Sequence, residues 1–307
     1  MKVTILGTAN AWGPNPFLPS GLHWPMTGSL SNGQQVQFRQ FRTSLLVETA
    51  DEKRILVDCG PDFSHQLRQF KVPPVDAIVL THSHTDHIGG IDELNLYRPT
   101  GRFPIPAYAT SACWNTIKNV RGLGYLIDNP ASPTRGPMTE MTLLVAGQNP
   151  TFSVGSVKVT PFQVQHSQFS PGAVGFVFEE TQKGQERSIL YTGDLWAVSN
   201  PANPMFRTQF DVAIIECDRA TGVAGPAAGG GHLSLDEIVR ILTNGFLSNP
   251  RPSRVTLVHF GDNGPTPAST YADWRNAATT ALAGIVPALG TSVQAADALI
   301  GYEGLVL

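Results

Sequence analysis

Three histidines and an aspartate lie within the six residues 82–87, in the order His-Ser-His-Thr-Asp-His. Imidazole nitrogens and carboxylate oxygens are ligands that Zn²⁺ takes in proteins, and they also accept Mn²⁺ or Fe²⁺. Residues two apart in an extended chain point to the same side, so His82 and His84 can share one metal ion. Asp86 and His87, beyond a turn, would face a second ion. The alternative is a polar loop with accidental histidines, but the chain has only eight histidines in all.

Two metal ions need more ligands than this segment supplies, and the second half of the chain offers them at the ends of predicted strands. His166 follows a predicted strand at 157–164, and Asp194 follows another at 188–191. His259 lies near the end of a third. A single residue in such a place is usually capped or solvated, whereas three of them favour a shared site.

Strands must position these residues, and the one before residues 82–87 is clear. Residues 76–80 contain a consecutive apolar run, typical of a short buried strand. Apolar periodicity predicts further strands at 2–6, 43–48, 54–57, 105–109, 142–145, 152–154, 157–164, 174–178, 188–191, 211–217 and 254–260, and helices at 62–70, 91–97, 111–120, 234–242 and 271–283. Strands and helices alternating in two similar halves predict an α/β fold with two β-sheets sandwiched between helices. No linker is evident, so we expect one domain over residues 1–307.

Residues 9–37 interrupt this pattern. Prolines and glycines that forbid regular structure recur there, at Gly13, Pro14, Pro16, Pro19, Gly21, Pro25 and Gly28. The segment also carries aromatic and imidazole side chains, at Trp12, Phe17, His23 and Trp24. A loop of this length is usually functional or disordered, and its aromatic content argues against disorder. We expect a lid or wall over the site; a surface or dimer-contact loop is the alternative.

The composition describes an ordinary globular protein. Of the 307 residues, 41% are hydrophobic and 15% are charged, and the formal net charge is −3. Neither this charge nor any run of Lys and Arg indicates binding to nucleic acid. The partner that we expect is therefore a small-molecule substrate.

The cysteines and the first residues bear on the compartment. Cys59, Cys113 and Cys217 are widely spaced and form no Cys-x-x-Cys pair, which fits a reducing compartment without a disulfide framework. Met1 and Lys2 lead into a strand rather than into the apolar run of a signal peptide. No stretch approaches the length of a membrane span. We expect a cytoplasmic protein with no membrane contact.

The His-x-His-x-Asp-His string after a hydrophobic strand resembles the signature of the metallo-β-lactamase superfamily. The resemblance implies the αββα sandwich of two mixed β-sheets, and a site for two divalent ions, Zn²⁺ or Mn²⁺. It assigns the ligands as follows: His82, His84 and His166 to the first ion; Asp86, His87 and His259 to the second; and Asp194 as the bridge between them.

Two such ions, about 3.5–4 Å apart, can share a water and hold it as a bridging hydroxide for attack on a substrate. Asp86 would orient or deprotonate that water. Asp58, in Asp-Cys-Gly, either supports the metal loop from behind the ligands or only caps the following turn.

His232 discriminates between branches of the superfamily. It stands in Gly231-His232-Leu233-Ser234, similar to a helix start in the phosphodiesterase branch, which includes ribonuclease Z and the phosphoribosyl cyclic phosphodiesterase. The resemblance implies that His232 donates to the phosphate or protonates the leaving oxygen, as expulsion of an alkoxide requires. The alternative is that His232 merely neighbours a helix cap formed by Ser234.

Further local matches point to the cyclic phosphodiesterase and to the pyrroloquinoline quinone biosynthesis protein B. They cover most of the chain from residue 41 onward, at 41–48, 58–63, 89–94 and 302–304. Both families carry N-terminal cysteines that residues 9–37 lack, and the extended tRNA-gripping arm of ribonuclease Z has no counterpart here. The resemblance therefore fails in the region expected to shape the substrate pocket.

Our first hypothesis is a dinuclear metal-dependent hydrolase, specifically a phosphodiesterase acting on a small or cyclic phosphate ester. Arg42 and Arg219 could contact the phosphate, or could be surface or ion-paired residues. A second hypothesis changes the substrate to a lactone or carboxylic ester. A third is a non-hydrolytic protein that supports a biosynthetic pathway, and a fourth, a ribonuclease, is disfavoured by the charge. Related families often form dimers, so a homodimer is a further expectation.

Overall fold

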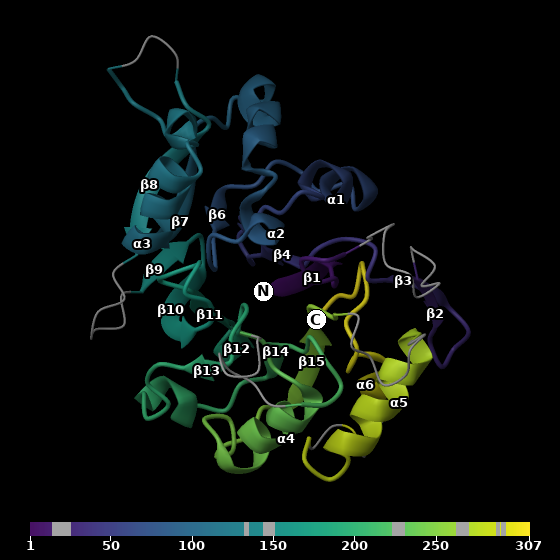
Figure 1. Cartoon of the computed structure of the whole chain (residues 1–307). Coiled ribbons are helices and arrows are strands. Elements are labelled where there is room, and N and C mark those ends of the chain that lie inside the picture. The colour runs from purple at the N-terminus through teal and green to yellow at the C-terminus, as the bar shows by residue number, and fades with distance from the viewer. Residues whose placement is uncertain are drawn as a thin grey trace.

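The structure, a computed structural model of the 307-residue chain, describes residues 1–13, 26–131, 135–143, 151–222, 231–261, 270–286, 289 and 293–307. Two mixed β-sheets face each other, and helices cover the outer face of each sheet (Figure 1). The predicted α/β fold, an αββα sandwich of two mixed β-sheets flanked by helices, is confirmed. That the chain forms one domain stays a prediction.

The first sheet contains six strands from the first half of the chain. In spatial order they are β1 (Lys2–Gly7), β4 (Ser44–Glu48), β5 (Arg54–Val57), β6 (Ala77–Val79), β7 (Ile105–Thr110) and β8 (Met138–Leu143). The pairs β1–β4 and β4–β5 are antiparallel, whereas β5 to β8 run parallel. The carboxyl ends of β5 and β6 therefore open at one edge, where Asp58 and residues 82–87 follow them.

The second sheet repeats this plan. In spatial order it contains β13 (Ala197–Val198), β10 (Val157–Gln165), β11 (Val174–Gln182), β12 (Gln185–Tyr191), β14 (Val212–Glu216) and β15 (Arg254–Val258), with β9 (Phe152–Val154) paired to β10. The strands β12, β14 and β15 are parallel, and β10 runs in their direction because two antiparallel pairings separate it from β12. The carboxyl ends of four strands thus meet at one edge.

Alternation along each strand divides the buried side chains between layers. Ile55 and Val57 of β5 pack between the sheets, while Leu56 faces the helices of the first layer. In β14, Val212 and Ile214 face the other sheet, and the residues between them face the second helical layer. Both faces of each central strand are buried, which explains the continuous apolar runs in the sequence.

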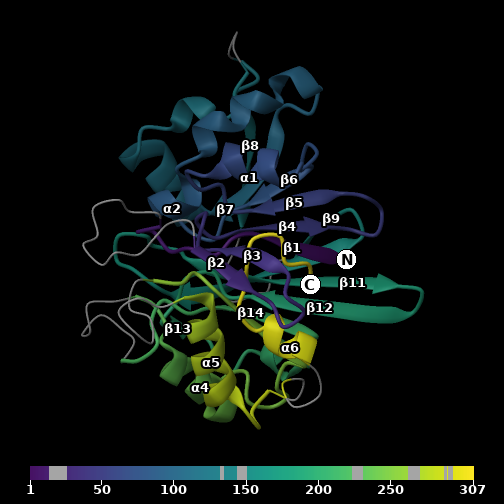
Figure 2. The same ribbon diagram turned by 90° about the vertical axis from the view of Figure 1, so that its right-hand side faces the viewer.

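Six α-helices and shorter turns complete the described fold. They are α1 (Phe63–Gln69), α2 (Thr85–Ile88), α3 (Ser111–Asn115), α4 (Leu235–Asn244), α5 (Tyr271–Leu282) and α6 (Val293–Asp297), with 3₁₀ turns η1 (Ile91–Thr100), η3 (Gly124–Leu126) and η4 (Pro204–Arg207) and a π turn η2 (Thr116–Val120). Figure 2 shows the layers from the side, with α1 and α2 beyond the first sheet and α4 and α5 beyond the second.

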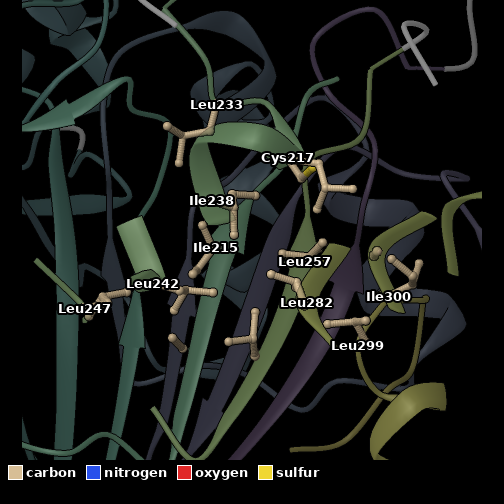
Figure 3. Packing of buried hydrophobic residues seen from close by; sticks show 14 of the residues in the cluster. Ile215, Cys217, Leu233, Ile238, Leu242, Leu247, Leu257, Leu282, Leu299 and Ile300 are labelled. Atoms are coloured by element: carbon tan, nitrogen blue, oxygen red, sulfur yellow. The ribbon is translucent and has the colours of Figure 1, made fainter. Parts of the chain in front are cut away.

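The helix α4 illustrates why the sequence forms these elements. Ser234 caps its first turn, accepting from the backbone N–H of Glu237, whose carboxylate accepts in return from the backbone N–H of Ser234. Ile238 and Leu242, four residues apart, are both fully buried against the second sheet. Figure 3 shows them packing beside Ile215 and Leu257. The helix predicted at 234–242 is confirmed, and it ends two residues later than predicted.

Two predicted helices differ in detail, and one short helix was not predicted. The helix predicted at 111–120 is α-helical only over α3, and it continues as the π turn η2. The segment predicted at 91–97 forms a 3₁₀ helix, η1. The unpredicted helix is α2, which begins at Thr85 within the segment 82–87. Asp86 and His87 lie in this helix, so their backbone geometry differs from that of His82.

Residues 9–37 are more regular than expected. Residues 26–38 form a hairpin of β2 (Met26–Ser29) and β3 (Gln35–Phe38), so the prediction that glycines and prolines exclude regular structure was wrong there. The Phe38 ring lies 5.6 Å from the Tyr271 ring, and the Gly28 backbone lies where a Cβ would clash with Tyr271. Packing on α5 thus overrides local propensity. Residues 14–25, and with them most of the expected lid, lie outside the described residues, as does Val145 of the strand predicted at 142–145.

Cys59, Cys113 and Cys217 are buried free thiols. Within the described ranges, none of the helices has the length and apolar character needed to cross a bilayer.

Candidate metal centre

The segment 82–87 changes backbone conformation halfway along. After β6 the chain stays extended to His84, whose φ of −68° and ψ of 154° place it at the N-terminal cap of α2. Asp86 and His87 then lie in the first turn of that helix. As predicted, the extended part presents His82 and His84 together, and the helical part presents the other two residues together.

Three histidines form what we call the imidazole group: His82, His84 and His166. One ring nitrogen of each lies within 4.8 Å of the others. His166 follows β10 directly, and its Nε2 lies 3.0 Å from Nδ1 of His84. The second ring nitrogen of His166 is held by the carbonyl oxygen of Gly231 at 2.7 Å. The sequence-predicted residues for the first ion are therefore brought together.

Four residues form what we call the carboxylate group: Asp86, His87, Asp194 and His259. Nε2 of His87 lies 3.2 Å from Oδ2 of Asp86, and Nε2 of His259 lies 3.4 Å from the same oxygen. Asp194 reaches this group from the loop after β12, and His259 reaches it from the end of β15. The residues predicted for the second ion are also gathered in one place.

Asp194 stands between the two groups. Its Oδ2 lies 3.2 Å from Nε2 of His87 and 3.1 Å from Nε2 of His259. The same oxygen lies 3.7 Å from Nε2 of His82 and 3.8 Å from Nε2 of His166. One carboxylate oxygen thus faces histidines of both groups, as a bridging ligand requires.

Several buried polar atoms of this cluster have no hydrogen-bond partner among the described residues. They include Nε2 of His82 and both carboxylate oxygens of Asp194. Buried polar atoms in native proteins are almost always satisfied, because leaving them unpaired is costly. A divalent cation would satisfy these nitrogen and oxygen atoms together, and they are ligands of the type that Zn²⁺ and Mn²⁺ accept. The residues present fit divalent metal binding.

The imidazole group is held in the neutral, metal-ready form. Burial lowers the pKa of His82 well below its usual value, and the neighbouring His87 lowers it further. Burial also lowers the pKa of His84, and it lowers that of His166 to about 4 despite the opposing charge of Asp194. Neutral imidazole is the form that binds a metal, so protons compete little with metal here at neutral pH.

The histidines of the carboxylate group behave in the opposite way. Burial alone would lower the pKa of His87, but the carboxylates of Asp194, Asp86 and Asp58 outweigh burial and raise it well above its usual value. Burial would likewise lower the pKa of His259, but the charge of Asp194 outweighs burial and raises this pKa well above its usual value. These two imidazoles hold protons at neutral pH, and a metal must displace them.

Asp58 supports the centre from behind. Its Oδ2 accepts from Nδ1 of His87 at 2.8 Å, and its Oδ1 accepts from the backbone N–H of Thr81 at 2.8 Å. The carboxylate fixes the His87 ring so that Nε2 faces the cluster. Of the two alternatives for Asp58, these contacts support the one in which it positions the metal loop.

Asp58 and His259 also share an unusual backbone. Their φ angles are 63° and 62°, in the left-handed region that residues other than glycine rarely adopt. Such positions cost about 1–3 kcal/mol and concentrate at functional sites. At His259 this turn follows β15 directly and aims the ring at Asp194.

His232 lies beside the carboxylate group. Its ring centroid is 5.0 Å from that of His259 and 4.8 Å from that of His166. Its Nδ1 pairs with Oε2 of Glu216 at 2.7 Å and lies 3.9 Å from Oδ2 of Asp194. The structure thus places His232 next to the predicted ligands, and the Ser234 cap of the alternative is present as well.

Glu216 is the residue that the sequence reasoning missed. It is fully buried at the end of β14, where its Oε1 accepts from the backbone N–H of Leu195 at 2.7 Å and of Leu233 at 3.2 Å. Burial opposes protonation of His232, but the Glu216 charge outweighs it and raises the pKa of His232 to about 9. A signal was present: Glu216 is the one charged residue in the otherwise apolar run of β14.

Asp194, Glu216, His232 and His259 also lie close enough together to hold a cation. This third grouping shares Asp194 and His259 with the carboxylate group, so the two cannot be filled independently. Nδ1 is the atom of His232 that lies near Asp194, and Oε2 of Glu216 already pairs with it.

The two arginines that could contact phosphate are both ion-paired. Nη1 of Arg42 lies 3.0 Å from Oδ1 of Asp62, and Nη2 of Arg219 lies 3.7 Å from Oδ2 of Asp218. This agrees with the ion-paired alternative. Nε of each arginine is buried and without a partner in the part of the chain that the structure describes.

Comparison with known proteins agrees with this architecture. Residues 53–260, more than half of the chain, match the model of the beta-lactamase superfamily domain. The anti-Pycsar protein Apyc1 of Bacillus phage 010DV004 is 28% identical over 261 residues, covering 76% of this chain and 88% of that protein.

Solved structures show the same fold at low identity. A diphosphatase of the PhnP family superposes with a TM-score of 0.66 at 18% identity, and Zn²⁺-bound PqqB from Methylobacterium extorquens with 0.66 at 16%. The short form of human tRNase Z gives 0.58 at 17%. Each match covers the whole of this chain and 96%, 99% and 98% of those chains, respectively. At these identities the likeness concerns the fold alone, and it agrees with the αββα sandwich described above.

Proposed function

The chain belongs to the beta-lactamase superfamily, and from this premise we propose that it is a dinuclear metal-dependent hydrolase that cleaves a small or cyclic phosphodiester. The observation that carries the proposal is the Glu216–His232 pair beside the candidate metal centre. Carboxylic esters and lactones have less need of such a donor, because their leaving groups depart from an intermediate that metal ions already stabilise. A diphosphatase among the fold neighbours supports chemistry at phosphorus.

In this proposal the imidazole group would hold one divalent ion, the carboxylate group would hold a second, and Asp194 would serve both. The ions would be Zn²⁺ or Mn²⁺, with Fe²⁺ as a further candidate. When bound, such ions lower the pKa of a water to near neutrality and offset negative charge on the substrate.

The chain's own residues would supply the proton transfers. Burial opposes ionisation of Asp86, but the charge of His87 and the hydrogen bond from His259 outweigh it and hold the pKa of Asp86 well below its usual value. Asp86 is therefore a carboxylate that can orient the attacking water and accept its proton. We assign it the role of base.

His232 would act at the other end of the reaction. Glu216 binds Nδ1, so the ring is fixed and the Nε2 proton can be given to a leaving oxygen. Glu216 keeps the imidazole protonated at neutral pH, as an acid requires. After the alkoxide leaves with the proton, Glu216 would favour reprotonation of the ring.

We test this function by turnover of bis(p-nitrophenyl) phosphate, a p-nitrophenyl acyl ester and a lactone, with Zn²⁺ or Mn²⁺ restored. In His232→Ala, diester turnover should fall by about a hundredfold or more, the scale of a lost general acid. His65→Ala is the matched control, because His65 is an exposed histidine on α1.

Ester or lactone turnover that does not depend on His232, without diester turnover, would replace the phosphodiesterase with the second hypothesis. Binding of both ions without turnover of any substrate would favour the non-hydrolytic one. The formal charge of −3 supports a small-molecule substrate over nucleic acid. A homodimer stays a prediction.

A further inference from the structure

Phe169 is the most exposed large apolar side chain among the described residues, with 78% of its surface accessible. A single exposed apolar residue is common on soluble proteins and by itself indicates nothing. Phe169 differs in two respects, which are the rigidity of the turn that carries it and the place of that turn.

Hydrogen bonds fix the turn on both sides of Phe169. The backbone N–H of Phe169 donates to Oγ of Ser167 at 3.1 Å, and that of Ser170 donates to the carbonyl oxygen of Ser167 at 3.1 Å. Oγ1 of Thr110 donates to the carbonyl oxygen of Gly172 at 2.8 Å. The backbone of Phe169 is therefore held in place, and its ring remains in water instead of folding onto the surface.

The turn is also attached to the candidate metal centre at two points. It begins at His166, whose ring belongs to the imidazole group. One residue beyond Phe169, Oγ of Ser170 accepts from the backbone N–H of Ser83 at 2.9 Å and lies 3.1 Å from Oγ of Ser83. Ser83 stands between His82 and His84. Since consecutive Cα atoms are about 3.8 Å apart, the Cα of Phe169 lies within about 4 Å of that of Ser170, which is hydrogen-bonded to Ser83.

We propose that Phe169 is a specificity-determining residue that stacks against a planar ring of the substrate. This rests on the proposed function and narrows the substrate to phosphate esters that carry an aromatic ring, such as a nucleobase. Stacking on one aromatic side chain tolerates different bases, because every base offers a π face. The rigid turn means that little backbone freedom is lost when the ring is covered.

Binding tests the proposal independently of turnover. A nucleoside 5′-monophosphate and ribose 5-phosphate share the sugar and the phosphate, and only the first carries a ring. Their affinities for the Zn²⁺-loaded protein would be measured by calorimetry. The wild type should prefer the nucleotide by about tenfold or more, the size of a base–aromatic contact.

Variants assign the preference to the ring of Phe169. Phe169→Ala should abolish it, and Phe169→Tyr should restore it. Val306→Ala is the control for loss of an exposed apolar side chain, because Val306 is 51% exposed and pairs with Thr4 of β1. This control should keep the wild-type preference. Phe169 is exposed, so all variants should fold, and thermal unfolding would confirm it.

Equal affinity of the wild type for the two ligands, binding of neither, or a preference unchanged in Phe169→Ala would overturn the role of Phe169. Diester turnover distinguishes this failure from that of the proposed function. Turnover of bis(p-nitrophenyl) phosphate without a ring preference removes only the role of Phe169. Absence of diester turnover removes the premise, and both proposals fall.

Discussion

The two ligand groups of the candidate metal centre share one six-residue segment, yet they differ in charge. In the imidazole group burial lowers the pKa of all three histidines. In the carboxylate group the acidic residues raise the pKa of both histidines. The difference arises chiefly from the charge of Asp194, which outweighs burial at His87 and His259, and the groups behind each ring add to it. A hydroxyl of Thr81 contacts His82 and a carbonyl oxygen contacts His166, whereas carboxylates of Asp58 and Glu216 stand behind His87 and His259.

This asymmetry suggests a division of work. The imidazole group offers a neutral site that can bind a cation without releasing protons. The carboxylate group binds its cation in exchange for protons, and it adjoins His232, which must remain protonated to act as an acid. Substitutions can perturb each group separately.

Removal of Asp194 should impair metal binding by both ligand groups, because its Oδ2 faces histidines of both groups. In Asp194→Ala both ions should be lost, and diester turnover should fall by at least about a thousandfold, equivalent to several kcal/mol of metal assistance. Atomic emission and turnover would be measured on the same samples. Retention of two ions with near-normal turnover would contradict the bridging role.

Glu216→Gln should affect the carboxylate group and the neighbouring His232, and it should leave the imidazole group unchanged. Loss of the charged partner should lower turnover by roughly ten- to a hundredfold, within the range of general acid catalysis. In the wild type the raised pKa of His232, about 9, means that the proton is held below this pH and lost above it. Turnover should therefore decline above about pH 9, and the decline should move to lower pH in the variant.

Glu186→Gln is the matched control for Glu216→Gln, since Glu186 is an exposed glutamate on β12. Its pH profile should match that of the wild type. An unchanged profile in Glu216→Gln would show that this carboxylate does not govern the proton on His232.

Asp58→Asn should weaken one ion only. Asparagine tolerates the left-handed backbone of residue 58, so the loop should keep its shape while His87 loses its charged partner. Affinity for the ion of the carboxylate group should fall by about 10–100-fold, as for other residues that support metal ligands from behind. Competition with a chromophoric chelator would measure both affinities. Equal weakening of both ions would contradict the separation of the groups.

Proton release gives the smallest signal. Zn²⁺ loading at pH 7 should release protons chiefly from the carboxylate group, because raised pKa values keep His87 and His259 protonated until metal binds. As pH rises, less proton release and tighter binding should be seen at that group. Calorimetry in buffers of different ionisation enthalpy would count the protons. Proton release should persist in His166→Ala and fall in His259→Ala. The reverse pattern would contradict the assignment of the released protons to the carboxylate group.

Much of this site could be predicted from sequence because its parts are local. The three histidines and one aspartate of residues 82–87 indicate a metal site by themselves. His166 and His259 follow the apolar runs that form β10 and β15. The continuous apolar runs also predicted strands of both sheets, because a strand that is buried on both faces can be recognised from its local sequence.

The remainder depends on contacts between distant residues. Glu216 pairs with His232, a histidine 16 residues away. The sequence alone does not show that the folded chain brings these two side chains together. The hairpin of β2 and β3 exists because Phe38 and Gly28 pack on Tyr271 of α5, which overrides the local turn signals. Likewise, only the fold brings Ser170 to Ser83 and so places Phe169 beside the metal loop.

The central claim is that the two ligand groups form one two-ion centre that hydrolyses phosphodiesters. The most direct measurement is turnover of bis(p-nitrophenyl) phosphate by protein stripped of metal and titrated back with Zn²⁺ or Mn²⁺. We predict no turnover without metal and full turnover at two equivalents per chain. Turnover that survives complete removal of metal, or no turnover with both groups filled, would contradict the claim.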